Sequence, residues 1–167
     1  MGRPDDAVQW LSSDERAAWL AVTALTMKLP SALDAQLQAD EGLSFFEYMV
    51  LAVLSEQDDR TLQMSVIATA TSASLSRLSH TMTRLERQGF VRRGRMPGAG
   101  RRTSATLTDA GYRKVVEAAP GHVARVRELV IDAISPAQLK TLRKIGAQVM
   151  ARIDPDHPGN SGEIAWV

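Results

Sequence analysis

Residues 71–108 read TSASLSRLSHTMTRLERQGFVRRGRMPGAGRRTSATLT, and this stretch decides the fold. Its first half predicts an amphipathic helix, because four apolar side chains recur at helical spacing: Leu75, Leu78, Met82 and Leu85. Ser72 is placed to cap the start of this helix, and Gly89 is placed to end it. The opposite face carries polar and basic side chains, so the helix has one side for a core and another for a charged partner.

The second half of the stretch predicts a basic β-hairpin. Residues 90–96 form the first expected strand and carry three arginines. The Pro-Gly-Ala-Gly sequence at 97–100 predicts a turn, and residues 103–107 alternate as a returning strand does. A helix with a basic face followed by a hairpin with an arginine tip is the outline of a winged helix-turn-helix.

Charge is segregated along the chain. Residues 60–114 hold eleven Lys and Arg against two Asp and Glu, a local net charge of +9. The whole chain of 167 residues has a net charge of only +1, so the remainder carries −8. A basic segment on an acidic scaffold is typical of proteins that bind duplex DNA.

Composition excludes several other classes. The chain has no cysteine, which excludes disulfides and thiolate metal sites. The spacing of His80, His122 and His157 fits no compact metal site, and we expect no metal or cofactor. No nucleophile elbow or phosphate-binding glycine loop is present, which argues against an enzyme. The absence of a long apolar run or a signal-peptide core predicts a cytoplasmic protein.

Helical patterns flank the basic stretch on both sides. A capping box at residues 12–15 opens a helix to about residue 40, in which Pro30 should cause a kink or a break. A second capping box at 44–47 opens a helix to about 56. We expect a short strand at 61–63 that joins the hairpin, and a brief helix to about residue 70 that Ser65 caps.

Two more helices follow the hairpin, at 109–133 and at 136–153, the latter with proline at its first position. The predicted fold class is therefore mainly α with a small β-hairpin. Residues 43–108 form the winged helix-turn-helix, and residues 12–42 and 109–153 form a helical dimerisation region. Residues 154–167 are expected to be a disordered tail.

The terminal helices carry apolar stripes that the basic module cannot all cover. We expect them to intertwine with their copies in a homodimer, because one reading helix contacts too few bases to be selective. The alternative is a monomer whose terminal helices pack on each other.

Three segments together resemble the MarR family of bacterial transcriptional regulators: LSFFEYMVLAVLSE (43–56), ASLSRLSHTMTRLERQGFVRR (73–93) and RRTSATLTDAG (101–111). The resemblance covers residues 12–153. It implies a homodimer that binds pseudo-palindromic operators and usually represses. It also implies release by a small aromatic or phenolic ligand, which sits between the dimerisation helices and the DNA-binding lobe. Family wings commonly carry an acidic residue two positions before the wing arginine, where this chain has Ala99.

Candidate DNA contacts fall into three groups. We expect four residues to reach base edges in the major groove, where arginine recognises guanine: Ser74, Ser76, Arg77 and His80. We expect a second group to contact the DNA backbone: Ser72, Thr81, Arg84, Arg87, Arg93 and Arg95. Arg101 and Arg102 are expected to enter the minor groove from the wing tip. For the first group the alternative is phosphate contact or a solvated face, and for the second it is a solvated surface charge. For the wing pair the alternative is a mobile loop that contacts nothing.

Trp19 is a candidate for stacking on an aromatic effector, and the alternative is that it packs in the core. The leading function is thus a dimeric, sequence-specific regulator that binds double-stranded DNA. The alternative is a winged-helix interaction module that binds an acidic protein partner or RNA.

Overall fold

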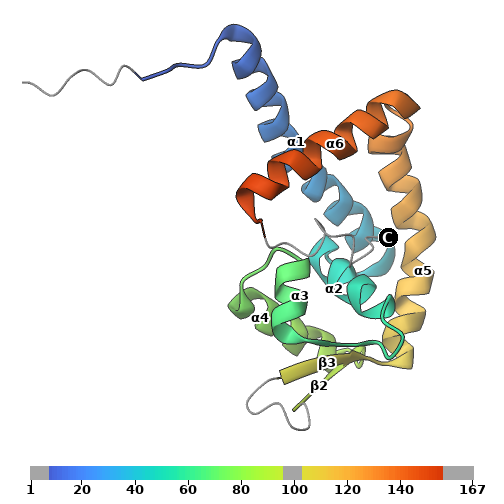
Figure 1. Ribbon diagram of the computed structural model, residues 1–167. Coiled ribbons are helices and arrows are strands. Elements are labelled where there is room, and N and C mark those ends of the chain that lie inside the picture. Colours follow the sequence, from blue (N-terminus) through green and yellow to red (C-terminus); the bar gives the residue numbers. More distant parts are fainter. Residues whose placement is uncertain (1–7, 96–102, 156–167) are drawn as a thin grey trace, which may run out of the picture.

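The computed structural model describes residues 8–95 and 103–155 (Figure 1). It confirms a mainly helical chain with a small three-stranded antiparallel sheet. In chain order the elements are α1 (Ser13–Glu41), α2 (Phe45–Ser55), β1 (Thr61–Gln63), α3 (Met64–Ala70), α4 (Leu75–Arg87), β2 (Val91–Arg95), β3 (Thr103–Leu107), α5 (Asp109–Val126), the π-helical segment η1 (Arg127–Ile131) and α6 (Pro136–Ile153). Arg101, Arg102 and residues 156–167 lie outside the described residues.

Helix α2 is the centre of the core. Seven of its eleven residues are buried, among them Leu51 and Leu54. The expected capping box at its start is present, since Ser44 and Glu47 each satisfy a backbone N–H of the other. The helix packs against α1, α3, α5 and β3. Burial of this apolar surface on nearly all sides is the main stabilising contribution to the fold.

The sheet has the strand order β1-β3-β2. As expected, β1 joins the hairpin, and it pairs antiparallel with β3 so that Thr61 lies opposite Thr106. Their two hydroxyl groups lie 2.9 Å apart and share a hydrogen bond. On the other side of β3, Val91 of β2 lies opposite Leu107, and both side chains are buried. This pairing fixes the hairpin next to α4.

Three local expectations need correction: a break at Pro30, a cap at Ser65, and an α-helix throughout 109–133. Helix α1 does not break at Pro30 but continues to Glu41, and its C-terminal half buries Leu33 and Leu37 against the core. This burial outweighs the one backbone hydrogen bond that proline removes. Ser65 does not cap α3, which begins directly after β1 without a side-chain cap. The α-helical part of the segment expected at 109–133 ends at Val126, where η1 takes over.

Two parts of the chain expose apolar side chains. Helix α6, which crosses over α1 in Figure 1, has no buried residue. Its apolar stripe is between 46% and 70% exposed: Leu142, Ile145, Val149 and Ile153. The N-terminal half of α1 exposes Trp19, whose side chain is 60% accessible, so the expectation that it packs in the core is wrong for the single chain. Within residues 8–95 and 103–155, no helix is long and apolar enough to cross a membrane.

His122 is a buried titratable group on α5. Its ring lies 4.5 Å from the ring of Tyr48 and 5.9 Å from that of Phe45, measured between centroids. Its Nδ1 atom has no hydrogen-bond partner among the described residues. Burial without a partner disfavours the charged imidazole, so the pKa of His122 is lowered from its ordinary value.

We expect the free energy of unfolding to fall as the pH drops below about 6.5, the ordinary pKa of histidine. In that range the unfolded chain takes up a proton that the folded state resists, so protonation favours unfolding. His122→Leu should keep its stability at pH 8 and lose much less than the wild type at pH 5. Urea unfolding at both pH values measures this. Equal losses for the two proteins would show that His122 is not responsible.

Candidate nucleic-acid interface

Helix α4 is capped two residues later than the sequence predicts. Its N-cap is Ser74, whose hydroxyl accepts a hydrogen bond of 3.2 Å from the backbone N–H of Arg77. Ser72 instead adopts a left-handed conformation with φ of 50°, and its backbone N–H donates to Thr69 in the last turn of α3. The expectation that Ser72 caps α4 is therefore wrong, because Ser72 forms the turn that separates the two helices.

The core-facing side of α4 is formed by three fully buried side chains, Leu78, Met82 and Leu85. Leu75 was expected to continue this stripe but is 57% exposed. It lies in the first turn of the helix and borders a groove of about 670 Å³ between α4 and the sheet. The face opposite the core is exposed: Ser76, His80 and Arg87. This face is available to an external partner.

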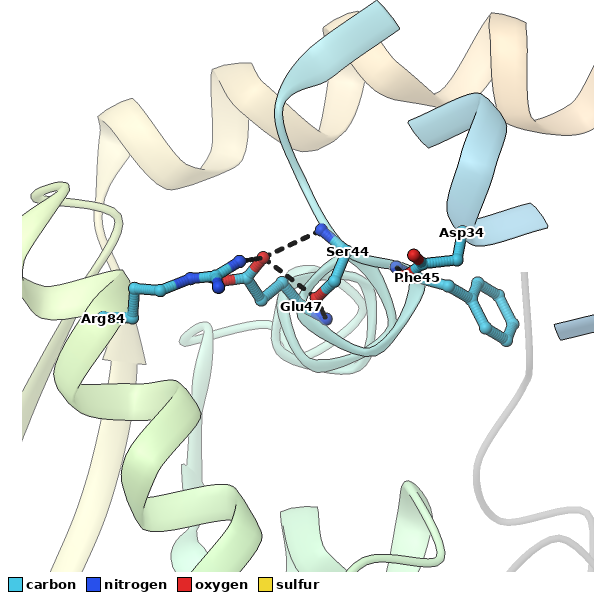
Figure 2. Close-up of polar contacts among 5 residues, drawn as sticks. All are labelled: Asp34, Ser44, Phe45, Glu47 and Arg84. Atoms are coloured by element: carbon cyan, nitrogen blue, oxygen red, sulfur yellow. Dashed lines mark hydrogen bonds and ion pairs between the residues drawn. The ribbon is translucent and has the colours of Figure 1, made fainter. Parts of the chain in front are cut away.

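Arg84 does not extend freely into solvent (Figure 2). Its guanidinium group donates from Nε and Nη2 to the two carboxylate oxygens of Glu47, at the start of α2. The side chain of Glu47 is 2% exposed, whereas that of Arg84 is 55% exposed. These hydrogen bonds raise the pKa of Arg84 above its ordinary value. The ion pair therefore joins the partner-facing helix to the centre of the core.

Arg77 also has a partner within the chain. Its guanidinium carbon lies 4.1 Å from the centroid of the Phe46 ring, a cation–π contact. Phe46 directly precedes Glu47 in the first turn of α2. The two arginines of α4 that face this turn are thus both held by it.

Arg93, on β2, donates hydrogen bonds to residues on the side of α4 that faces the sheet. Its backbone N–H and its Nε donate to Glu86 at 2.9 and 2.8 Å, and its Nη2 donates to Thr83 at 3.1 Å. The hydrogen bonds from Arg93 hold the pKa of the Glu86 carboxyl below its ordinary value. This contact fixes the wing to α4.

The remaining predicted site residues are distributed around the same surface. Arg87, on α4, and Arg95, on β2, are exposed and form no ion pair with any of the residues that the structure describes. Ser72, Ser74, Ser76 and His80 are exposed, while Thr81 is half-buried. The surface that α4 and β2 present together is polar and basic.

Sequence reasoning missed the residues that hold this surface in place. These are acidic and aromatic residues that contact the arginines or the first turn of α2: Asp34, Phe46, Glu47 and Glu86. The capping box identified Glu47 only as a cap for α2. Nothing in the spacing of the sequence links it to Arg84, which lies 37 positions away.

A cavity of about 480 Å³ lies between α1, α2 and α4. Its walls include the aromatic rings of Phe45 and Phe46, together with the charged side chains of Asp34 and Arg77. Trp19 is not among its lining residues; α1 contributes Pro30, Ser31 and Asp34. The cavity offers aromatic surface, one cation and one anion to a small ligand, and it touches the partner-facing helix directly.

No family model and no curated protein sequence matches the chain. Among solved structures, it is similar to Sco3205, a MarR family transcriptional regulator from Streptomyces coelicolor, in complex with DNA. The two are 38% identical with a TM-score of 0.86, over 92% of this chain and 98% of that one. AbsC, a MarR family transcriptional regulator from Streptomyces coelicolor, is 35% identical with a TM-score of 0.83, over 89% and 99%.

The fold is also shared by CouR from Rhodococcus jostii RHA1, solved bound to p-coumaroyl-CoA. That chain is 20% identical, with a TM-score of 0.70 over 89% of this chain and 97% of the other.

Proposed function

The chain belongs to the MarR family of transcriptional regulators, and we propose that it binds pseudo-palindromic operator DNA as a homodimer and represses transcription. The observation that carries this proposal is the exposed polar face of α4 beside a basic wing, in a chain 38% identical to a regulator solved with DNA. In this proposal residues 43–108 bind DNA, and residues 12–42 and 109–153 form the dimer. The function is binding rather than catalysis.

We propose that the N-terminal half of α4 reads bases through Ser74, Ser76, Arg77 and His80. Arg77 would have to leave the ring of Phe46 to reach a base edge. The phosphate contacts are best supported for Arg87 and Arg95, which are exposed and unpaired within the part of the chain that the structure describes. Thr81 and Ser72 stay candidates at the edges of the helix, and Arg101 and Arg102 stay candidates for the wing tip.

The proposal of a homodimer is supported by the exposed apolar stripes of α1 and α6. A monomer rarely exposes so much apolar surface. A second copy of the chain is the partner that would cover both stripes by two-fold symmetry. Two reading helices would then meet two half-sites of one operator.

The test is a titration against duplex DNA from upstream of the protein's own gene, with random duplex and RNA as competitors, at two salt concentrations. We expect tight binding that survives both competitors, and symmetric protection of half-sites about one helical turn apart. If random duplex competes as well as the operator, the protein has only a basic patch without sequence selectivity, because phosphate contacts carry no sequence information. Removal by RNA alone would favour an RNA-binding module.

We further propose that the cavity between α1, α2 and α4 takes a small aromatic acid that releases DNA. Its aromatic walls and the guanidinium of Arg77 suit a planar anion. The test panel is the three acids benzoate, 4-hydroxybenzoate and salicylate, with the thioester p-coumaroyl-CoA as a separate arm because CouR was solved with it. A supporting compound raises the melting temperature of the free protein and weakens operator binding; linkage requires both effects. If no compound changes either quantity, aromatic acids are not the effectors.

A further inference from the structure

The carboxylate of Glu47 is fully occupied by hydrogen bonds. Its Oε2 atom accepts from the backbone N–H of Ser44 at 2.8 Å and from the Ser44 hydroxyl at 2.9 Å. Both oxygens also accept from Arg84, as Figure 2 shows. A carboxylate that is 2% exposed must be paired to remain charged, and here its cation comes from α4. Glu47 is therefore both the N-terminal cap of α2 and the anchor of α4.

The same turn of α2 is attached to a third element. The backbone N–H of Phe45 donates to Asp34 of α1 at 2.8 Å, and Figure 2 shows the Asp34 carboxylate pointing at this N–H. Phe46 lies under Arg77 of α4. Arg77 and Arg84 are seven residues apart and so lie on one side of α4. The first turn of α2 thus contacts α4 at two points, two helical turns apart, and contacts α1 at one.

This arrangement limits the rotation of α4 about its own axis. The apolar stripe of Leu78, Met82 and Leu85 determines which side of α4 is buried. Apolar contacts are not directional, so they do not fix the rotation angle closely. A guanidinium that donates two parallel hydrogen bonds to one carboxylate has a narrow angular preference. The exposed Ser76 and His80 lie beside this anchor, because His80 is three residues from Arg77 and four from Arg84 and so shares their side of the helix. The direction in which these side chains meet a base therefore depends on the angle that the ion pair sets.

We propose that Glu47 is a positioning residue, which orients α4 for base reading through Arg84, and that Arg84 serves DNA binding through this pair rather than by contacting a phosphate. The proposal rests on the DNA-binding function proposed above. It assigns Glu47 a task in selectivity, although its side chain is buried and negatively charged.

The direction in which one substitution changes operator affinity tests this proposal. Glu47→Gln removes a negative charge from the DNA-binding lobe and keeps an acceptor for the cap of α2. If Arg84 contacts a phosphate, this variant frees its guanidinium and should bind all DNA as tightly as the wild type or more tightly. If Glu47 positions α4, the variant should lose about tenfold or more in operator affinity, roughly the value of one base contact. Its affinity for random duplex should stay the same or rise.

Arg84→Gln completes the test. For a positioning pair, we expect it to lose operator affinity about as much as Glu47→Gln, and the double variant should lose no more than either single variant. The salt dependence of binding should keep its slope. A true phosphate contact would instead reduce affinity for operator and random duplex alike and lower the slope by about 1. That result for Arg84→Gln, with no operator loss in Glu47→Gln, would overturn the proposal.

A matched control separates positioning from stability. Glu41 pairs with Lys114 at 2.6 Å between α1 and α5, and both side chains are about one-fifth exposed. Glu41→Gln removes a comparable ion pair that does not touch α4. We expect this variant to melt at a lower temperature with an unchanged ratio of operator to random affinity. If Glu47→Gln behaves in the same way, Glu47 is only structural and the proposal is wrong.

The operator titration includes the wild type alongside the variants. The proposed DNA-binding function and the proposed positioning role of Glu47 can therefore fail separately. A wild type without operator preference would remove both of them. A wild type that prefers its operator, with Glu47→Gln unchanged in that preference, would remove only the positioning role.

Discussion

Gly111→Ala is expected to lower the free energy of unfolding by about 3 kcal/mol, since overpacking a closed site forces the backbone to shift. A Cβ atom at Gly111 would lie 2.2 Å from the backbone oxygen of Phe90 and 2.6 Å from a methyl group of Leu107. The Phe90 oxygen cannot retreat easily, because it accepts hydrogen bonds from the backbone and the hydroxyl of Thr108. The same hydroxyl accepts from the backbone N–H of Gly111 at 3.0 Å.

Thermal unfolding followed by circular dichroism measures this effect. A loss of this size corresponds to a melting temperature about 6–12 °C lower for a chain of this length. Gly94→Ala is the matched control, because a Cβ there meets nothing within 4 Å and the backbone has no positive φ. We expect it to change stability by less than about 0.5 kcal/mol. If Gly111→Ala is as stable as this control, the close approach of α5 to Phe90 and Leu107 is wrong.

The double variant Leu142→Glu and Ile145→Glu is expected to be a folded monomer that has lost about a hundredfold or more in operator affinity. Both side chains are about half exposed on α6, which buries nothing in the single chain. Two charges in an apolar dimer interface would be desolvated without partners and would oppose association. A monomer binds only one half-site. It lacks the gain in affinity that arises when binding of the first α4 brings the second α4 close to its half-site.

Sedimentation velocity gives the oligomeric state, and the operator titration gives the affinity. Affinity for random duplex should change far less, since neither substitution lies in α4 or the wing. Ala147→Glu with Ala151→Glu adds the same charge at exposed positions on the opposite side of α6 and should remain dimeric. A dimeric Leu142 and Ile145 double variant with wild-type affinity would show that α6 does not form the proposed interface.

Much of the fold follows from local patterns in the sequence. The capping boxes at Ser12 and Ser44, and the cap at Ser135, are where the spacing predicts them. The stripe of α4 and the pairing of residues 61–63 with the hairpin are confirmed as well. The caps and the stripe of α4 succeed because the interacting groups lie within four residues of each other or share a simple repeat, so the sequence contains the complete signal.

Only the tertiary structure shows which arginines of the basic module have partners within the chain. The sequence shows that Arg77, Arg84 and Arg93 are on one basic module, and charge alone suggests that all of them face a polyanion. Folding brings Phe46, Glu47 and Glu86 against them, and two of these three partners come from another helix. Position along a helix gives the side on which a residue lies, but not what packs there.

The same distinction explains the smaller errors. Leu75 belongs to the helical repeat of α4, yet it lies beyond the edge of the core and stays exposed. Pro30 disfavours a helix locally, yet the burial of Leu33 and Leu37 keeps α1 continuous. Sequence by itself therefore determined the elements, the caps at Ser12, Ser44 and Ser135, and the basic character of the module. Tertiary packing determined which charges are paired inside the molecule, because pairing depends on contacts between residues far apart in the chain.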